Sequence, residues 1–200
     1  YVPTKTEKPM VLCDYTHAVG NSNGGVHDYW RLAKKYPSFQ GGFVWDFQDQ
    51  ALWWPSDASV TGSDHIFVFG GDFNDYDPTD NSFNCNGIIA ADRSLHPHAY
   101  EVAYQYRSIL TSATAQEAAA GKVEIYNENF FINLSRYAMD WSVEVDGQAV
   151  LSGSTTNFTV APQGRQSISL GYDMKAIEQA YGESLEGHNI YLNVSYRLRT

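Results

Sequence analysis

Two acidic strand ends are the parts of this sequence best suited to chemistry. The apolar run Met10–Cys13 stops at Asp14, and His17 follows three residues later. A short apolar run bounded by turn signals predicts a buried strand, and α/β barrels carry catalytic groups at the carboxyl ends of such strands. From the residues alone, Asp14 fits a nucleophile, a general base or a carboxylate that caps a loop.

A second strand of the same kind delivers an aromatic side chain. Gly41–Val44 leads into Trp45 and Asp46, the second acidic strand end. The preceding segment 27–36 has apolar residues at helical spacing and ends before a proline. Strand, helix and strand in this order predict one βαβ unit of a parallel sheet. Trp45 fits a stacking platform for a sugar or a core residue, and His17 fits a partner for a substrate hydroxyl or a satisfied core histidine.

The segment 72–87 is rich in Asp and Asn and contains Asp80, Phe83 and Asn86. This density of turn-forming residues predicts a long ordered loop. Hard cations take side-chain and backbone oxygens from loops of this kind, so a cation site is one interpretation. A loop held only by hydrogen bonds from its Asn and Asp side chains is the other.

The remaining elements divide the chain into two unlike parts. We expect a polar loop over 51–64, a strand over 66–69 and a helix over 97–110. Residues 111–121 have little to bury and predict a linker, after which the apolar period changes from about 3.6 residues to 2. Short alternating runs, including one over 158–160, and an Asp146–Gly147 turn predict an antiparallel sandwich, with a helix or an insertion over 174–181.

Composition limits the function classes. The 200 residues carry a formal net charge of −10, which argues against a nucleic-acid partner, and no apolar run is long enough for a membrane span. The two cysteines lie in different motifs without metal-ligand spacing, and Cys13 is expected to be a small core residue. The acidic balance fits a neutral or cationic ligand, or solubility alone.

Taken together, the motifs resemble those of glycoside hydrolase family 2 β-galactosidases. Residues 12–22, LCDYTHAVGNS, resemble the family pattern L-C-E-Y-x-H-A-M-G-N-S, and residues 41–50, GGFVWDFQDQ, resemble G-G-F-V-W-D-W-V-D-Q. Later loop motifs match in order at residues 70–73, 83–87, 91–93 and 96–97.

This resemblance implies an α/β plus all-β chain in three segments. Residues 1–110 would be the C-terminal part of a (β/α)8 TIM barrel, residues 111–121 a linker, and residues 122–200 an immunoglobulin-like antiparallel β-sandwich. About three strands are expected before residue 111, too few to close an eight-stranded barrel. We therefore expect the chain to be a fragment of a longer protein, and its cellular compartment is undetermined.

The resemblance also implies a role for each residue that matches a family motif. The galactose contacts would come from His17, Trp45 and Asn86, with sodium held by Asn86 and the backbone carbonyl of Phe83 and with Asp80 as a nearby loop acid.

The nucleophile position falls on Asp14, where the family has Glu. Asp is one methylene shorter, which withdraws the carboxylate by about 1.5 Å. Retaining glycosidases need their two carboxyl groups about 5–5.5 Å apart, so this difference bears directly on rate. An engineered or sequencing change, a natural change that cripples the enzyme and a compensating backbone shift all fit the sequence.

The activity implied is that of a retaining β-galactosidase, a homo-oligomer with sodium and magnesium as cofactors. The family's acid/base Glu and magnesium ligands lie upstream of Tyr1, so we expect the isolated chain to be inactive. Two alternatives remain open: a truncated remnant that serves as a packing or interaction module, and a family 2 enzyme for another sugar. A β-glucuronidase needs cationic groups for its substrate, and Arg93 is the one Arg inside the motifs.

Overall fold

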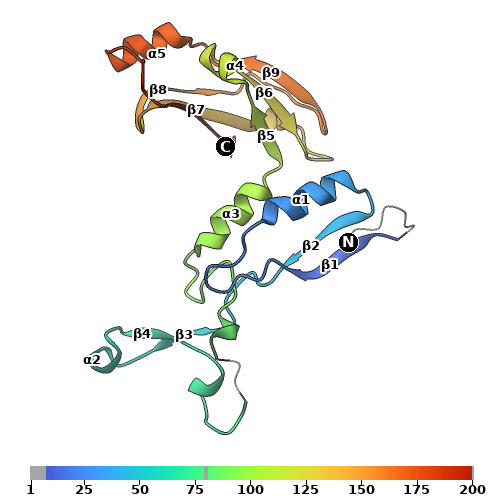
Figure 1. Ribbon diagram of the computed structural model, residues 1–200. Helices are drawn as coiled ribbons and strands as arrows, with labels where there is room; N and C mark the ends of the chain where they lie inside the picture. Colours follow the sequence, from blue (N-terminus) through green and yellow to red (C-terminus); the bar gives the residue numbers. More distant parts are fainter. Residues whose placement is uncertain (1–7, 79–80, 200) are drawn as a thin grey trace. The chain divides into compact units, whose positions relative to one another are not determined.

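The computed structural model describes residues 8–78 and 81–199 (Figure 1). The chain forms two units, Tyr1–Tyr106 and Arg107–Thr200. We expected the boundary after residue 110, four residues later than the observed one. The difference arises because strand β5 (Ile109–Ser112) pairs antiparallel with β6 (Lys122–Asn127) of the second unit.

The segment 111–121, expected to be a linker, is ordered. It contains the end of β5 and the short helix α4 (Ala115–Ala119). The Glu117 amide donates to Thr114 Oγ1 at 3.2 Å, and the Thr114 amide donates to Glu117 Oε2 at 2.8 Å. This reciprocal pair is a capping box, which starts a helix where the composition indicated only a connection.

In the first unit, β1 (Met10–Tyr15) and β2 (Phe39–Val44) pair in parallel, with α1 (Val26–Lys35) between them in the chain. Parallel strands need a crossover of this kind, and the predicted βαβ unit is confirmed. Basic residues close the last turn of α1 and Asp28 lies in its first turn, which suits the helix dipole.

Strand β1 is not the fully buried strand that we predicted. Val11, Cys13 and Asp14 are exposed, and Tyr15 is buried. Within residues 8–78 and 81–199, β2 is the one strand that pairs with β1, so the other edge of β1 has no strand partner there. Cys13 is therefore not a core residue in this structure.

Tyr106, the residue after the helix α3 (Pro97–Gln105), contacts both β1 and α1 through aromatic side chains. The hydroxyls of Tyr15 and Tyr106 are hydrogen-bonded, and the Trp30 ring stacks on the Tyr106 ring at 4.9 Å. Pro97 stands in the first turn, where its missing amide costs nothing. The helix ends earlier than expected because β5 begins at Ile109.

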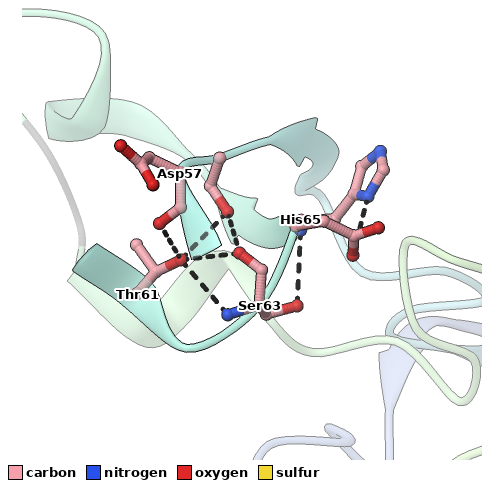
Figure 2. Close-up of polar contacts among 6 residues, drawn as sticks. Asp57, Thr61, Ser63 and His65 are labelled. Carbon is pink, nitrogen blue, oxygen red and sulfur yellow. Dashed lines mark hydrogen bonds and ion pairs between the residues drawn. The ribbon is translucent and has the colours of Figure 1, made fainter. Parts of the chain in front are cut away.

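Residues 51–64, expected to form a loop, contain most of a hairpin. It consists of β3 (Leu52–Pro55), the single-turn helix α2 (Ala58–Thr61) and β4 (His65–Val68), close to the strand predicted over 66–69. Figure 2 shows the polar tip. Thr61 Oγ1 donates to the Ser63 carbonyl at 2.7 Å, and Asp57 Oδ1 accepts from the Ser59 amide at 2.9 Å. The turn-forming residues thus cap a helix instead of leaving the segment irregular.

The flanks of this hairpin are aromatic and open to solvent. Trp53 lies opposite Phe67 with ring centroids 4.7 Å apart, and it stacks on His65 at 5.2 Å. Trp54 meets the edge of Phe73 and is 50% exposed. Cross-strand aromatic pairs stabilise a two-stranded ribbon that would otherwise be marginal in water.

The second unit is the predicted antiparallel sandwich. One sheet has the order β10-β7-β8 and the other β5-β6-β9, and both contribute to one core. The remaining strands are β7 (Tyr137–Val145), β8 (Gln148–Thr155), β9 (Arg165–Ser169) and β10 (Ile190–Leu198). The core residues are Val123, Ile125, Leu134, Met139, Val143, Val145, Phe158, Val160, Leu170, Tyr172 and Ile177.

Two further expectations for this unit have different outcomes. Residues 158–160 were expected to be a strand but are not one, although Phe158 and Val160 are buried. The Val160 carbonyl accepts from the Leu134 amide of a 3-10 turn (Leu134–Arg136) rather than from a neighbouring strand. Residues 174–181 do form the helix α5 (Met174–Tyr181). No helix in the part of the chain that the structure describes has the length and apolar character needed to cross a bilayer.

A buried asparagine ties the loops of the sandwich together. Asn127 is fully buried, and its Nδ2 lies within 3.1 Å of the carbonyls of Ile132, Val160 and Ala161. Its Oδ1 accepts from the Asn129 amide at 3.0 Å. Both ends of the side-chain amide therefore satisfy backbone groups that water does not reach.

Asn127→Ala is expected to destabilise the second unit by about 2–3 kcal/mol, because it leaves several buried polar groups without partners. Urea unfolding followed by Trp141 fluorescence measures the change. The control Asn157→Ala, at an exposed site, should change stability by less than about 0.5 kcal/mol. Equal effects of the two substitutions would contradict the assignment.

Tyr15 gives the first unit a stability that depends on pH. Burial, together with the hydrogen bond to Tyr106, raises the pKa of Tyr15 above the usual 10.0. The fold favours the neutral phenol, so this contribution is complete below pH 10 and is lost as the pH rises above 10. Tyr15→Phe removes the titrating group, and the urea midpoint of this unit should then fall less between about pH 9 and 11 than in the wild type. Tyr100→Phe, at an exposed position, should retain the full wild-type decline.

Candidate active site

Asp14 is the penultimate residue of β1, one residue before the strand ends. Its side chain is exposed, and no hydrogen bond or ion pair of its carboxylate is found among residues 8–78 and 81–199. Thr16 follows with a φ of 49°, a left-handed conformation that turns the chain away from the strand direction. The part of the chain that the structure describes thus presents an unpaired carboxylate at the carboxyl end of a parallel strand.

Trp45 connects the ends of the two strands. Its amide donates to the Tyr15 carbonyl at 3.3 Å, and its carbonyl accepts from the Ala18 amide at 2.8 Å. His17 lies between these two anchor points in the chain. Trp45 is 39% exposed and is joined to Asp46 by a cis peptide bond. The two hydrogen bonds therefore place the His17 and Trp45 backbones next to each other.

The loop that contains Phe83 and Asn86 reaches the same place. The Asp46 amide donates to the Asn86 carbonyl at 2.7 Å, so Asn86 lies beside the residue that follows Trp45. The ring of His17 meets the ring of Phe83 edge-on, with centroids 5.0 Å apart. The structure thus brings together four of the predicted site residues. Asp80 lies outside the described residues.

Two buried polar atoms in this cluster have no partner. His17 Nε2 and Asn86 Oδ1 are both shielded from solvent and are without a hydrogen bond within the described residues. Asn86 is 1% exposed, and its Nδ2 donates to the Phe83 carbonyl at 2.8 Å. Buried polar atoms are normally paired, so each of these two calls for an explanation, and an absent ligand is one.

The oxygen atoms of this cluster fit a hard cation. Asn86 Oδ1 is free to coordinate, and the Phe83 carbonyl retains a second lone pair besides the one that accepts from Asn86. Hard cations prefer such oxygen ligands. Within the described ranges, no group of three His, Cys, Asp or Glu side chains is arranged to hold a metal ion, so a site for a softer metal is not indicated.

The neighbouring thiol is not a competing nucleophile. Burial raises the pKa of the Cys85 thiol, and the carboxylates of Asp49 and Asp72 raise it further. Because the thiolate is the reactive form, Cys85 stays protonated and unreactive at neutral pH. The carboxylate of Asp14 remains the better candidate for attack on an electrophilic carbon.

Two residues that shape this region were not predicted from the sequence. Asp49 is 6% exposed and pairs with His96 Nε2 at 3.0 Å. The two residues stand far apart in the sequence, and neither follows a pattern that predicts the contact. Gly87 carried the one available signal, because a glycine inside an Asp- and Asn-rich loop often marks a close backbone approach.

Comparisons with known proteins give a family match for each half of the chain. Residues 2–111 match the family model described as glycosyl hydrolases family 2, TIM barrel domain. Residues 123–200 match the model described as beta-galactosidase, domain 4. The first match covers nearly all of the first unit and extends to residue 111, and the second match begins at residue 123, within the second unit.

Several curated relatives named beta-galactosidase cover most of the chain. The protein from Priestia megaterium is 36% identical over 99% of the chain, and that from Clostridium acetobutylicum is 38% identical over 85%. The protein from Halalkalibacterium halodurans is 38% identical over 93%. The chain spans 17–18% of the length of these relatives. From the match over its first 111 residues, this chain belongs to glycosyl hydrolases family 2.

Proposed function

We propose that this chain is the nucleophile-bearing segment of a retaining β-galactosidase. The observation that carries the proposal is made at the carboxyl ends of β1 and β2. Among residues 8–78 and 81–199, the Asp14 carboxylate has no hydrogen-bond partner, and neither do the buried atoms His17 Nε2 and Asn86 Oδ1. Relatives named beta-galactosidase support the choice of sugar. The substrate would be a β-galactoside, cleaved at its terminal non-reducing galactose.

In this proposal, the Asp14 carboxylate attacks the anomeric carbon of galactose. A carboxylate–carbon bond forms as the glycosidic bond breaks, and the leaving oxygen takes a proton from a general acid outside this chain. Water then cleaves the glycosyl–enzyme bond, with the same outside group acting as a base. Asp14 is suited to the first step because its carboxylate is exposed and accepts no hydrogen bond from residues 8–78 and 81–199 that would make it less nucleophilic.

The neighbouring residues would bind and orient the sugar. His17 Nε2 would pair with a galactose hydroxyl, which satisfies an atom that is otherwise buried without a partner. The partly exposed ring of Trp45 would pack against the apolar face of the pyranose. Asn86 would contact the sugar from the loop side, with Asp80 nearby, as the family resemblance implies.

Sodium would be held by Asn86 Oδ1 and the backbone carbonyl of Phe83, with further ligands from outside the chain. Its chemistry would be to fix a sugar hydroxyl by coordination. Magnesium ligands are expected elsewhere in a full-length enzyme. We also propose that the second unit has an immunoglobulin-like topology and that the full-length enzyme is a homo-oligomer. These proposals rest on the family match and on the oxygen atoms described above.

The isolated 200-residue chain is expected not to hydrolyse 4-nitrophenyl β-galactoside, because the general acid would lie on a barrel strand outside it. Release of nitrophenol above the buffer rate, measured with pure chain, would refute this expectation. An unrelated acidic protein at the same concentration serves as the control for trace contamination.

Within a full-length enzyme that contains this segment, Asp14→Glu should raise kcat by about a hundredfold. The added methylene moves the carboxylate about 1.5 Å toward the anomeric carbon, and a misplacement of about 1 Å costs on the order of a hundredfold in rate. Asp46→Glu, at the neighbouring strand end, should bring no such gain. A loss of activity in Asp14→Glu would mean that the backbone already compensates for the shorter side chain.

A further inference from the structure

We infer that Asp49 is a positioning residue, which holds Asn86 in the orientation that the proposed sugar and cation site requires. The part of this inference that concerns ligand binding rests on the function proposed above, whereas the part that concerns the structure of the loop does not. Among the described residues, the Asp49 side chain makes no hydrogen bond to a residue that we propose to bind substrate. It acts through the residue that follows Asn86 in the chain.

The Asp49 carboxylate is a buried bridge between two segments. Oδ1 accepts from the Gly87 amide at 2.7 Å, and Oδ2 accepts from His96 Nε2 at 3.0 Å. The side chain is 6% exposed, whereas that of His96 is 36% exposed. A carboxylate withdrawn from water to this degree is costly unless it is hydrogen-bonded, and both of its oxygens are.

Backbone hydrogen bonds bring the loop to this bridge. The Asp46 amide donates to the Asn86 carbonyl at 2.7 Å, and the Ile88 amide donates to the Asp46 carbonyl at 2.9 Å. Farther along, the Gln50 amide donates to the Asn84 carbonyl at 2.8 Å. Segments 46–50 and 84–89 therefore lie side by side, although they are far apart in the sequence.

Gly87 shows how close this approach is. A Cβ atom at this position would lie 2.1 Å from the Asp49 nitrogen, well inside any real contact. Only glycine allows the two backbones to come this near, and only at this distance can the Asp49 carboxylate reach the Gly87 amide.

Asn86 is consequently fixed on three sides. Its carbonyl accepts from Asp46, the next amide donates to Asp49, and its Nδ2 donates to the Phe83 carbonyl at 2.8 Å. The atom left over is Oδ1, which is buried and without a partner among the described residues. Loss of the Asp49 bridge frees the Asn86–Gly87 peptide, and the direction of this oxygen is then no longer set.

The test uses the full ¹⁵N-labelled chain and sodium chloride as the probe, with choline chloride at matched ionic strength as the reference. Asp49→Asn removes the charge and one acceptor while keeping the side-chain size. Asp28→Asn is the matched control, because it removes a carboxylate charge in the same unit, on α1, where Asp28 pairs with Arg31. Amide hydrogen exchange reports the Asp46-to-Asn86 bond, and the Asn86 side-chain NH2 resonances report the response to sodium.

In Asp49→Asn, exchange of the Asp46 amide should be at least about tenfold faster, with the Phe39 amide of β2 unchanged. The sodium concentration that half-shifts the Asn86 NH2 resonances should rise by about tenfold or more. Asp28→Asn should match the wild type within about twofold on both measures. His96→Gln retains a side-chain donor near Asp49 and should change both measures in the same direction but by less. This variant provides the test if Asp49→Asn does not fold.

Two results would overturn the inference. One is wild-type exchange at Asp46 in the Asp49 variant. The other is faster exchange at Phe39 as well, which would make Asp49 a residue of general stability only. If the wild-type chain itself gives no sodium response at Asn86, these two oxygens do not hold sodium without ligands from outside the chain. The ligand-binding part of the inference then fails for this chain, and the positioning role is decided by the exchange of the Asp46 amide alone.

Discussion

The pair of hydrogen bonds made by the Trp45 backbone is the constraint on which the candidate site depends. One joins Trp45 to Tyr15 at the end of β1, and the other joins it to Ala18 beyond the turn. Parallel strands always bring their carboxyl ends to the same edge, but the turn residues that follow are free to diverge. These bonds keep His17 and the Trp45 side chain at one edge, and the loop residue Asn86 is attached to the next peptide.

Local patterns in the sequence were sufficient for the elements that carry chemistry. The apolar run before Asp14, the amphipathic spacing of α1 and the alternation of the sandwich strands each predicted the observed element. These patterns failed where a polar residue can either form a turn or cap a helix. Thr114 and Asp57 were interpreted as parts of irregular segments, yet each caps a short helix. Both T-x-x-E and D-x-S are helix-start signals, so closer attention to capping would have recovered α4 and α2.

Long-range pairing could not be predicted in the same way. The contact between Asp49 and His96 joins two loops across 47 positions, and no period or spacing encodes it. The exposure of Val11 and Cys13 could not be predicted by counting apolar residues, because the burial of a strand depends on which other strands lie next to it. The sandwich, with its continuous core, follows its sequence pattern more closely than the parallel sheet does. Patterns predict burial well when every partner strand belongs to the same short stretch of chain.

The β3–β4 hairpin has a consequence for how this fold tolerates change. The polar groups at its tip satisfy one another, as between Thr61 and Ser63 (Figure 2). Its two strands pair in unbroken register from Leu52 to Val68. Its shape is thus specified by neighbours within its own seventeen residues. Evolution can therefore lengthen or recompose the tip without disturbing the carboxylate edge, which makes this hairpin a natural place for lineages to diverge while their chemistry stays the same.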